Sequence, residues 1–146
     1  MEGLPSISII IPSYNSKKTI MQCLNSVLNQ SYKGIDQVIV VDSSDDGTDE
    51  VIKDFFPSVK LIHLREKTLP GAARNIGAGA TNSEYIAFTD TDCIVDYYWI
   101  ENILHRMENG GHDAVGGVIL NGTPESWSGT LGYLNEFTYV LLIFSI

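Results

Sequence analysis

Residues 6–15 read SISIIIPSYN, and this stretch decides the fold. Four of the six residues 6–11 are isoleucine, a β-branched apolar residue, and such a composition is typical of a strand that is covered on both faces. The run ends at Pro12, which has no N–H group to donate to a neighbouring strand. Polar residues 13–15 follow at once. The stretch therefore predicts a buried strand with a polar turn at its carboxyl end.

The rest of the chain repeats this pattern of a short apolar run followed by a helical segment. Further strands are predicted at residues 38–41, 59–64, 85–88 and 114–120, with amphipathic or Ala-rich helical segments between them. Such alternation indicates a mostly parallel sheet with helices on both faces and right-handed crossovers. We therefore expect an α/β, Rossmann-like fold, with residues 1–146 forming a single domain.

Composition and charge narrow the class of protein. Of the 146 residues, 44% are hydrophobic and 18% are charged, as in ordinary globular proteins. The formal net charge of −9 argues against nucleic acid as the main partner, because phosphate backbones attract lysine and arginine. The two cysteines, Cys23 and Cys93, lack the spacing of a disulfide framework or a zinc site. We therefore expect a reduced, cytoplasmic environment.

The C-terminal residues 131–146 contain an apolar run at 137–144. A membrane-spanning helix needs about 20 apolar residues, so this run is too short to cross a bilayer. It predicts a core helix, a helix for membrane association or homo-oligomer contact, or the start of a longer helix. The pattern stops without a helix-capping signal, so we expect a fragment of a longer chain.

Three polar clusters stand where predicted strands end, at residues 12–15, 42–48 and 90–92. The carboxyl ends of parallel strands share one edge of the sheet, so clusters far apart in the sequence converge there. This edge is also where open α/β sheets bind their ligands. Each cluster alone is a weak signal, but together they predict one binding site.

The third cluster, Asp90-Thr91-Asp92, places two carboxylates close together. Two such groups repel each other unless a cation or a hydrogen-bond donor lies between them. Mg²⁺ and Mn²⁺ prefer oxygen ligands and commonly take one or two carboxylates together with substrate phosphates. The motif therefore predicts a divalent metal that binds a diphosphate. The alternative is that both aspartates cap the following turn.

Arg74 and Tyr14 are two further candidates. Arg74 lies among small residues, and its planar guanidinium suits a phosphate, although a surface arginine on an Ala-rich helix is the alternative. Tyr14 follows the first strand, where its ring can stack on a base or pack against the core. Residues 71–79 lack the glycine pattern of a dinucleotide fingerprint, so a redox function has no support.

Four segments, in this order and with similar spacing, resemble family 2 of the glycosyltransferases, which has the GT-A nucleotide-sugar-binding fold. They are residues 9–15 (IIIPSYN), 38–48 (VIVVDSSDDGT), 71–77 (GAARNIG) and 88–92 (FTDTD). The resemblance covers residues 6–120 and implies that they form the nucleotide-binding core. Residues 121–146 would then begin the acceptor half or form a C-terminal helix.

The resemblance implies an enzyme that transfers a sugar from a nucleoside-diphosphate sugar of the UDP or GDP type. The acceptor would be a polysaccharide, a lipid carrier or a glycan, and the reaction would invert the anomeric carbon. Many relatives build cell-surface polysaccharide or modify lipid carriers, which implies work at the cytoplasmic face of a membrane. The sugar and the acceptor themselves are left open.

The resemblance also assigns nucleotide-sugar-binding residues, namely Pro12, Tyr14, Asn15, Asp42, Arg74 and Asp90. Tyr14 would pack against the base, and Asp42 would lie near the base or the ribose. Arg74 would contact the nucleotide, and Asp90 would face the ribose or the diphosphate. Asp92 would hold the Mn²⁺ or Mg²⁺ that bridges the phosphates and neutralises charge on the leaving group.

Two departures from the family pattern limit these expectations. Many relatives carry a second acidic residue directly after the position of Asp42, where this chain has Ser43, so the preferred nucleotide is left open. The family's general base lies beyond the D-x-D motif, and after residue 120 only Glu125 and Glu136 supply carboxylates. Neither stands in a recognisable motif, so no catalytic base is assigned. The chain alone is expected to bind the donor and to turn over poorly or not at all.

Two alternative functions are left open by the sequence. A nucleotidyltransferase can also use a D-x-D motif, but it needs a basic, Gly-rich loop after the first strand, where this chain has residues 12–15. A non-catalytic nucleotide-binding or interaction domain would use residues 131–146 as its contact surface.

Overall fold

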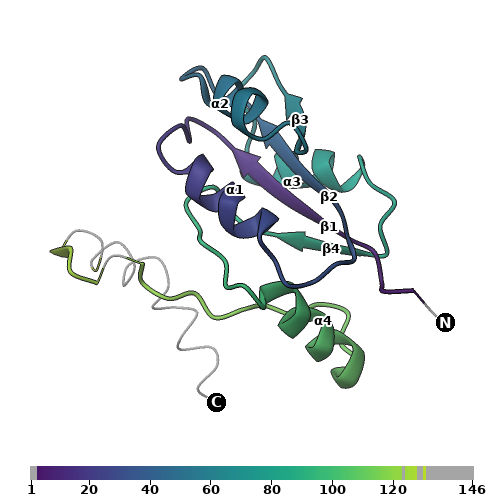
Figure 1. Cartoon of the computed structure of the whole chain (residues 1–146). Coiled ribbons are helices and arrows are strands. Elements are labelled where there is room, and N and C mark those ends of the chain that lie inside the picture. The colour runs from purple at the N-terminus through teal and green to yellow at the C-terminus, as the bar shows by residue number, and fades with distance from the viewer. Residues whose placement is uncertain (1–2, 123, 128–129, 131–146) are drawn as a thin grey trace. The chain divides into compact units, whose positions relative to one another are not determined.

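The computed structural model describes residues 3–122, 124–127 and 130, and the chain divides into two compact units, Met1–Asp113 and Ala114–Ile146. The first unit holds a sheet with helices on both faces (Figure 1). Strands and helices alternate along it in the predicted order. They are β1 (Ile7–Ser13), α1 (Ile20–Leu28), β2 (Ile35–Asp42), α2 (Thr48–Phe55), β3 (Lys60–His63), α3 (Pro70–Ala78), β4 (Tyr85–Phe88) and α4 (Trp99–Gly110).

The sheet has the strand order β3-β2-β1-β4, and every neighbouring pair is parallel. β1 lies between β2 and β4, and every one of its residues is buried. A central strand that is covered on both faces needs an apolar sequence, which explains the unbroken run at residues 9–11. The predicted α/β class is confirmed, and the carboxyl ends of all four strands lie at one edge.

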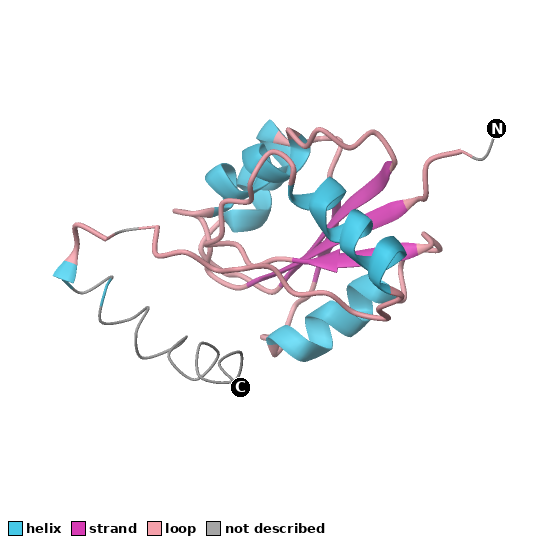
Figure 2. Cartoon of the chain, turned by 90° about the horizontal axis from the view of Figure 1, so that it is seen from below, coloured by secondary structure: helices cyan, strands magenta, loops and turns pink. Residues whose placement is uncertain are grey.

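Alternate residues of β1 pack into two different cores, because side chains of a strand point to opposite faces. Ile9 belongs to the larger core, which the helices α1, α2 and α4 complete. Ile10 belongs to the smaller core, where Ala73 of α3 packs against the sheet. Helices therefore lie on both sides of the strands (Figure 2).

The helix α3 lies unusually close to the sheet. A Cβ atom added at Gly77 would collide with Cγ2 of Ile10 and would come within 3.3 Å of Cγ2 of Val41. Ala73, one turn earlier, is also buried against β1 and β2. The small residues that make this segment a poor isolated helix are thus what allow it to pack here.

The predicted fifth strand at residues 114–120 is wrong. These residues belong to the second unit and have no regular secondary structure. Gly116 and Gly117 weaken the strand, because glycine pays a large entropic cost and offers no side chain to pack. Val118 and Leu120 are 87% and 80% exposed, so the apolar residues of this run bury little surface.

The described residues contain no helix that combines the length and the hydropathy needed to cross a bilayer. The apolar run at 137–144 lies outside the described residues. Its predicted role in membrane association or homo-oligomer contact therefore stays a prediction.

Candidate functional site

The carboxyl edge of the sheet carries a cavity of about 740 Å³. Its walls come from the turn after β1, the loop between β3 and α3, the helix α3 and the segment after β4. Polar clusters from distant parts of the sequence thus meet at one edge, as the parallel topology requires. Of the predicted site residues, all but Asp42 line this cavity, namely Pro12, Tyr14, Asn15, Arg74, Asp90 and Asp92.

Asp42 ends β2 behind the cavity wall, with no exposed surface. Its carboxylate accepts hydrogen bonds from Ser13 Oγ at 2.7 Å and from Ser44 through both Oγ at 2.5 Å and the backbone N–H at 3.2 Å. His63 Nδ1 lies 2.8 Å from the same carboxylate. These four contacts and its complete burial tie Asp42 into the protein, and its predicted contact with a nucleotide stays a prediction.

The contacts around Asp42 shape the turn after β1. Ser44 Oγ, which donates to Asp42, also accepts a hydrogen bond from the backbone N–H of Asn15 at 2.7 Å. Asn15 has a positive φ of 51°, a conformation that asparagine tolerates better than most residues. Its side-chain oxygen accepts from the backbone N–H of Asp45 at 3.2 Å. A buried carboxylate therefore ties the ends of β1, β2 and β3 together beneath the cavity.

Arg74 and Asp90 form an ion pair inside the cavity. Nη2 of Arg74 lies 2.5 Å from Oδ1 of Asp90, and their side chains are 33% and 52% exposed. Nε of Arg74 is buried and has no hydrogen-bond partner within the part of the chain that the structure describes. At this exposure the pair adds little to stability, but it partly neutralises the aspartate pair. Arg74 keeps donors that a phosphate oxygen can accept from.

Two contacts hold the Asp90-Thr91-Asp92 segment against the first helix. The hydroxyls of Ser16 and Thr91 lie 2.8 Å apart, and the Cys23 thiol of α1 donates to the backbone carbonyl of Asp90 at 3.3 Å. Asp92 is exposed, and its only hydrogen bond among the described residues is a long one, 3.9 Å from Cys93 Sγ. The backbone of this segment is therefore anchored while the Asp92 carboxylate stays accessible.

The described residues hold no group of three or more histidine, cysteine or acidic side chains that could by themselves bind a metal. Asp90 and Asp92 supply two carboxylates in the cavity. Mg²⁺ and Mn²⁺ sites of substrate complexes commonly use one or two carboxylates and take further oxygens from the substrate. The residues therefore fit a divalent ion whose coordination a diphosphate completes.

The two thiols below this segment are poor nucleophiles. Burial, followed by the nearby Cys93, Asp92 and Asp90, raises the pKa of Cys23 to about 12. Burial also raises the pKa of Cys93. Because the thiolate is the reactive form, neither cysteine is suited to covalent catalysis.

Tyr14 is 41% exposed at the cavity, and sequence reasoning missed its neighbour Lys67. Nζ of Lys67 lies 4.1 Å from the centre of the Tyr14 ring. His63, which belongs to none of the sequence clusters, is a partner of Asp42. The first contact joins two loops and the second joins the ends of β2 and β3, so no local sequence pattern predicts them.

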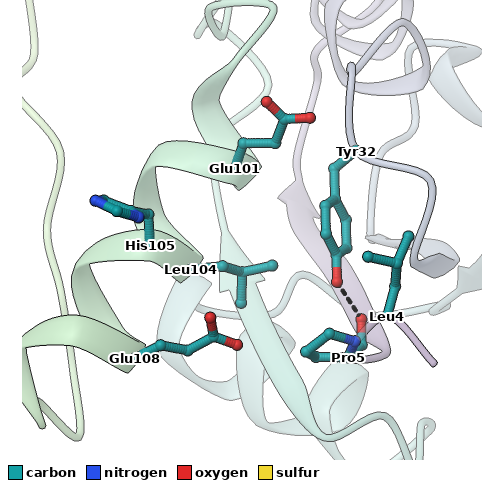
Figure 3. Close-up of a pocket in the computed structure, with 7 residues that line it drawn as sticks. All are labelled: Leu4, Pro5, Tyr32, Glu101, Leu104, His105 and Glu108. Carbon is teal, nitrogen blue, oxygen red and sulfur yellow. Dashed lines mark hydrogen bonds between the residues drawn. The ribbon is translucent and has the colours of Figure 1, made fainter. Parts of the chain in front are cut away.

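A second hollow of about 180 Å³ lies at the opposite edge of the sheet, where Pro5 precedes β1 and Tyr32 precedes β2 (Figure 3). The Tyr32 hydroxyl donates to the carbonyl of Pro5 at 2.6 Å. Burial, and then the nearby Glu108 and Glu84, raise the pKa of Tyr32. Acidic side chains without a lysine or arginine line this hollow, so it is unsuited to a diphosphate.

A family model described as glycosyl transferase family 2 matches residues 8–144 of the chain. The chain belongs to glycosyl transferase family 2. The resemblance read from the four sequence segments is confirmed, and the family speaks against the alternative of a nucleotidyltransferase.

Curated members of family 2 align with most of the chain. Glycosyltransferase AglE of Haloferax volcanii is 37% identical over 119 residues, which are 78% of this chain and 39% of that protein. WfaP of Escherichia coli, named a UDP-Glc:alpha-D-GlcNAc-diphosphoundecaprenol beta-1,3-glucosyltransferase, is 39% identical over 108 residues, 70% of this chain and 41% of that protein. The chain thus spans about two fifths of the length of these family 2 relatives.

Solved structures give the same fold. Crystal structures of Staphylococcus aureus TarS 1-349 in complex with UDP and with UDP-GlcNAc superpose with a TM-score of 0.67. Each is 24% identical and covers 82% of this chain, which in turn covers 39% and 38% of them. The predicted GT-A, Rossmann-like architecture of a family 2 domain is therefore confirmed.

Proposed function

We propose that this domain binds a nucleoside-diphosphate sugar in the carboxyl-edge cavity and that the protein transfers the sugar to an acceptor. The observation that carries the proposal is the meeting of Tyr14, Arg74, Asp90 and Asp92 in one cavity. The relatives support it, because WfaP is named for a UDP-Glc donor and TarS crystallises with UDP and UDP-GlcNAc. A UDP-type donor is therefore the first to test, and a GDP-type donor the second.

Each cavity residue has a chemistry that suits one part of such a donor. The exposed face of Tyr14 offers a platform on which a base stacks. The guanidinium of Arg74 has donors beyond the one that Asp90 uses, and these suit the diphosphate. Asp92, with Asp90, would hold Mn²⁺ or Mg²⁺. When bound, such an ion neutralises charge that develops on the leaving nucleoside diphosphate.

We propose a single displacement that inverts the anomeric carbon. A bond forms from the acceptor oxygen to that carbon while the bond to the diphosphate oxygen breaks, and a general base takes the acceptor proton. Glu125 is exposed in the second unit, and Glu136 lies outside the described residues. We assign no base, and we propose that this chain alone binds the donor with little or no turnover.

The acceptor is proposed as a class only: a polysaccharide, a lipid carrier or a glycan, presented at the cytoplasmic face of a membrane. WfaP and ExoO of Rhizobium meliloti, named a succinoglycan biosynthesis protein, support this range by their names. Vesicles that carry a diphospholipid and soluble glycans are the two acceptor sets to compare with the full-length protein.

Calorimetry with UDP and GDP tests the donor site. We expect binding in the presence of Mn²⁺ and a loss of at least about tenfold in affinity when EDTA replaces the ion, as for one charge-assisted contact. Asp92→Asn should cause a similar loss in Mn²⁺ and should no longer respond to EDTA. Asp54→Asn, which removes an exposed carboxylate of α2, is the matched control and should bind like the wild type.

Two outcomes would count against this proposal. Equal affinity for UDP or GDP with and without EDTA would show that binding does not depend on a metal ion. If no nucleoside diphosphate binds at millimolar concentration, the proposed donor site is refuted.

A further inference from the structure

Three polar side chains along one side of α1 bond to the backbone that follows the aspartate pair. Cys23 and Ser26 belong to the helix, and Gln30 lies just beyond its end. They are spaced by three and four residues, which places them on one helical face, and together they form the α1 stripe. Their partners outside α1 lie between Asp90 and Ile100, from the aspartate pair to the first turn of α4. The helix thus runs beside the whole segment.

Gln30 makes the most contacts of the three. It is 4% exposed, and its Nε2 donates to the backbone carbonyl of Asp96 at 2.8 Å and to that of Ser26 at 3.1 Å. Its Oε1 accepts from the backbone N–H of Ile100 at 3.2 Å. The side chain therefore joins the end of α1 to the start of α4. Removing the amide would take a partner from backbone groups on both elements, which is costly where they are buried.

The other two members of the α1 stripe bond nearer to the middle of the segment. Ser26 Oγ accepts from the backbone N–H of Val95 at 3.1 Å and donates to the carbonyl of Cys23 at 2.8 Å. The Cys23 thiol donates to the carbonyl of Asp90 at 3.3 Å, and the backbone N–H of Cys93 donates to the same oxygen at 3.1 Å. The backbone is therefore held on both sides of the second aspartate of the pair.

Asp92 is thus placed through its backbone and not through its carboxylate. The side chain is exposed, and its one hydrogen bond among the described residues is the long contact with the Cys93 thiol. Where this carboxylate meets an ion is consequently decided by the groups that hold the neighbouring backbone. Groups that orient a metal ligand without touching the metal commonly change its affinity by about ten- to a hundredfold.

We infer that the α1 stripe positions Asp92 for the divalent ion and that Gln30 is its main positioning residue. The inference rests on the proposed function and deepens it. Tyr14 and Arg74, which suit the base and the diphosphate, stand on the turn after β1 and on α3. Loss of the stripe should therefore weaken the contribution of the metal and leave the other contacts of the nucleotide in place.

Calorimetry of UDP binding, in Mn²⁺ and in EDTA, tests the inference. Gln30→Met keeps the length of the side chain without its amide. We expect its affinity for UDP in Mn²⁺ to fall at least about tenfold, while the weaker affinity in EDTA stays that of the wild type.

Ser26→Ala gives a second, milder test, which applies even if Gln30→Met fails to fold. It removes the acceptor of the Val95 N–H and should cause a smaller loss of the same kind. Ser26→Thr keeps the hydroxyl and should restore the response to Mn²⁺.

Hydrogen exchange supplies a measurement that needs neither metal nor nucleotide. In the free protein, the amide protons of Cys93 and Val95 bond to Asp90 and Ser26, and not to Gln30. If Gln30 orders the whole segment, these two protons should nevertheless exchange faster in Gln30→Met than in the wild type.

Ser8→Ala is the matched control for a general loss of stability. Ser8 is fully buried in β1, and its Oγ lies 2.8 Å from the hydroxyls of Thr81 and Ser83, away from the aspartate pair. This variant should also melt at a lower temperature than the wild type, but its affinity for UDP should respond to Mn²⁺ as the wild type does. Thermal unfolding of each variant thus separates lost stability from lost positioning.

An unchanged response of Gln30→Met and Ser26→Ala to Mn²⁺ would overturn the inference, even if both variants melt earlier. Equal losses of affinity in Mn²⁺ and in EDTA would also overturn it, because that result assigns the α1 stripe to the support of the whole domain. A wild type that binds UDP equally well in Mn²⁺ and in EDTA would instead refute the proposed metal site on which the inference rests.

Discussion

Asp42 and Asp92 are aspartates at the same edge of one sheet, yet their surroundings are opposite. Asp42 is fully buried, and its oxygens accept from Ser13 and Ser44 and contact His63. Asp92 is exposed and has only a long contact with the neighbouring thiol among the described residues. A carboxylate whose partners come from the protein stabilises the fold, while one with free oxygens is available to a ligand.

Among the variants that test this difference, Asp42→Ala is expected to change the stability most. The substitution would leave buried hydroxyls and an imidazole without their acceptor, and losing one member of such a buried network costs about 3–5 kcal/mol. We expect the free energy of unfolding in urea to fall by this amount.

Asp92→Ala is the matched control for that experiment. It should stay within about 0.5 kcal/mol of the wild type, because an exposed side chain whose one contact among the described residues is long contributes little to stability. If the two variants were equally stable, the distinction between a supporting and a ligand-binding aspartate would be wrong.

A smaller effect on stability is expected from variants that test how closely α3 packs against the sheet. Gly77→Ala would force a Cβ against Ile10 and push α3, which carries Arg74, away from the sheet. Overpacking of this kind costs about 1–3 kcal/mol. Gly71→Ala has nothing within 4 Å of its new Cβ, and it should stabilise the helix by up to about 1 kcal/mol. Equal urea midpoints for both variants would contradict the close packing of α3.

The last effect is confined to alkaline pH and concerns the thiol beneath the aspartate pair. Burial and the nearby charges raise the pKa of Cys23 from 9.0 to about 12. As the pH rises, the unfolded chain therefore loses the Cys23 thiol proton at a lower pH than the folded chain does. The contribution of this thiol to the free energy of unfolding is complete below about pH 9 and is lost progressively toward pH 12.

Cys23→Ser keeps a donor for the carbonyl of Asp90 but does not titrate in this range. Its free energy of unfolding should fall less steeply with pH above 9 than that of the wild type. Identical slopes in the two proteins would show that Cys23 does not carry the alkaline loss.

Most of the fold could be predicted from sequence because its signals are local. An apolar run that ends in a polar turn marks β1, β2 and β4, and periodic apolar residues mark α1, α2 and α4. The strand predicted at residues 114–120 was wrong, because strand formation depends on packing partners that a pattern of residues does not reveal.

The candidate site was predictable only as far as the edge on which it lies. Strand order and the shared carboxyl edge brought Tyr14, Arg74 and Asp92 together. Whether a side chain at that edge points into the cavity or beneath it depends on non-local neighbours. Asp42 is buried by contacts with residues of three different segments, and Lys67 reaches Tyr14 from another loop.

The strand β4 is short, and among the described elements it is hydrogen-bonded only to β1. The aspartate pair comes shortly after it, so these acids depend on a short edge strand. Amide protons of Tyr85–Phe88 should therefore exchange with solvent sooner than those of β1. Any polypeptide that pairs with the outer side of this strand would slow that exchange and, by suppressing local opening, strengthen the binding of a donor without touching it.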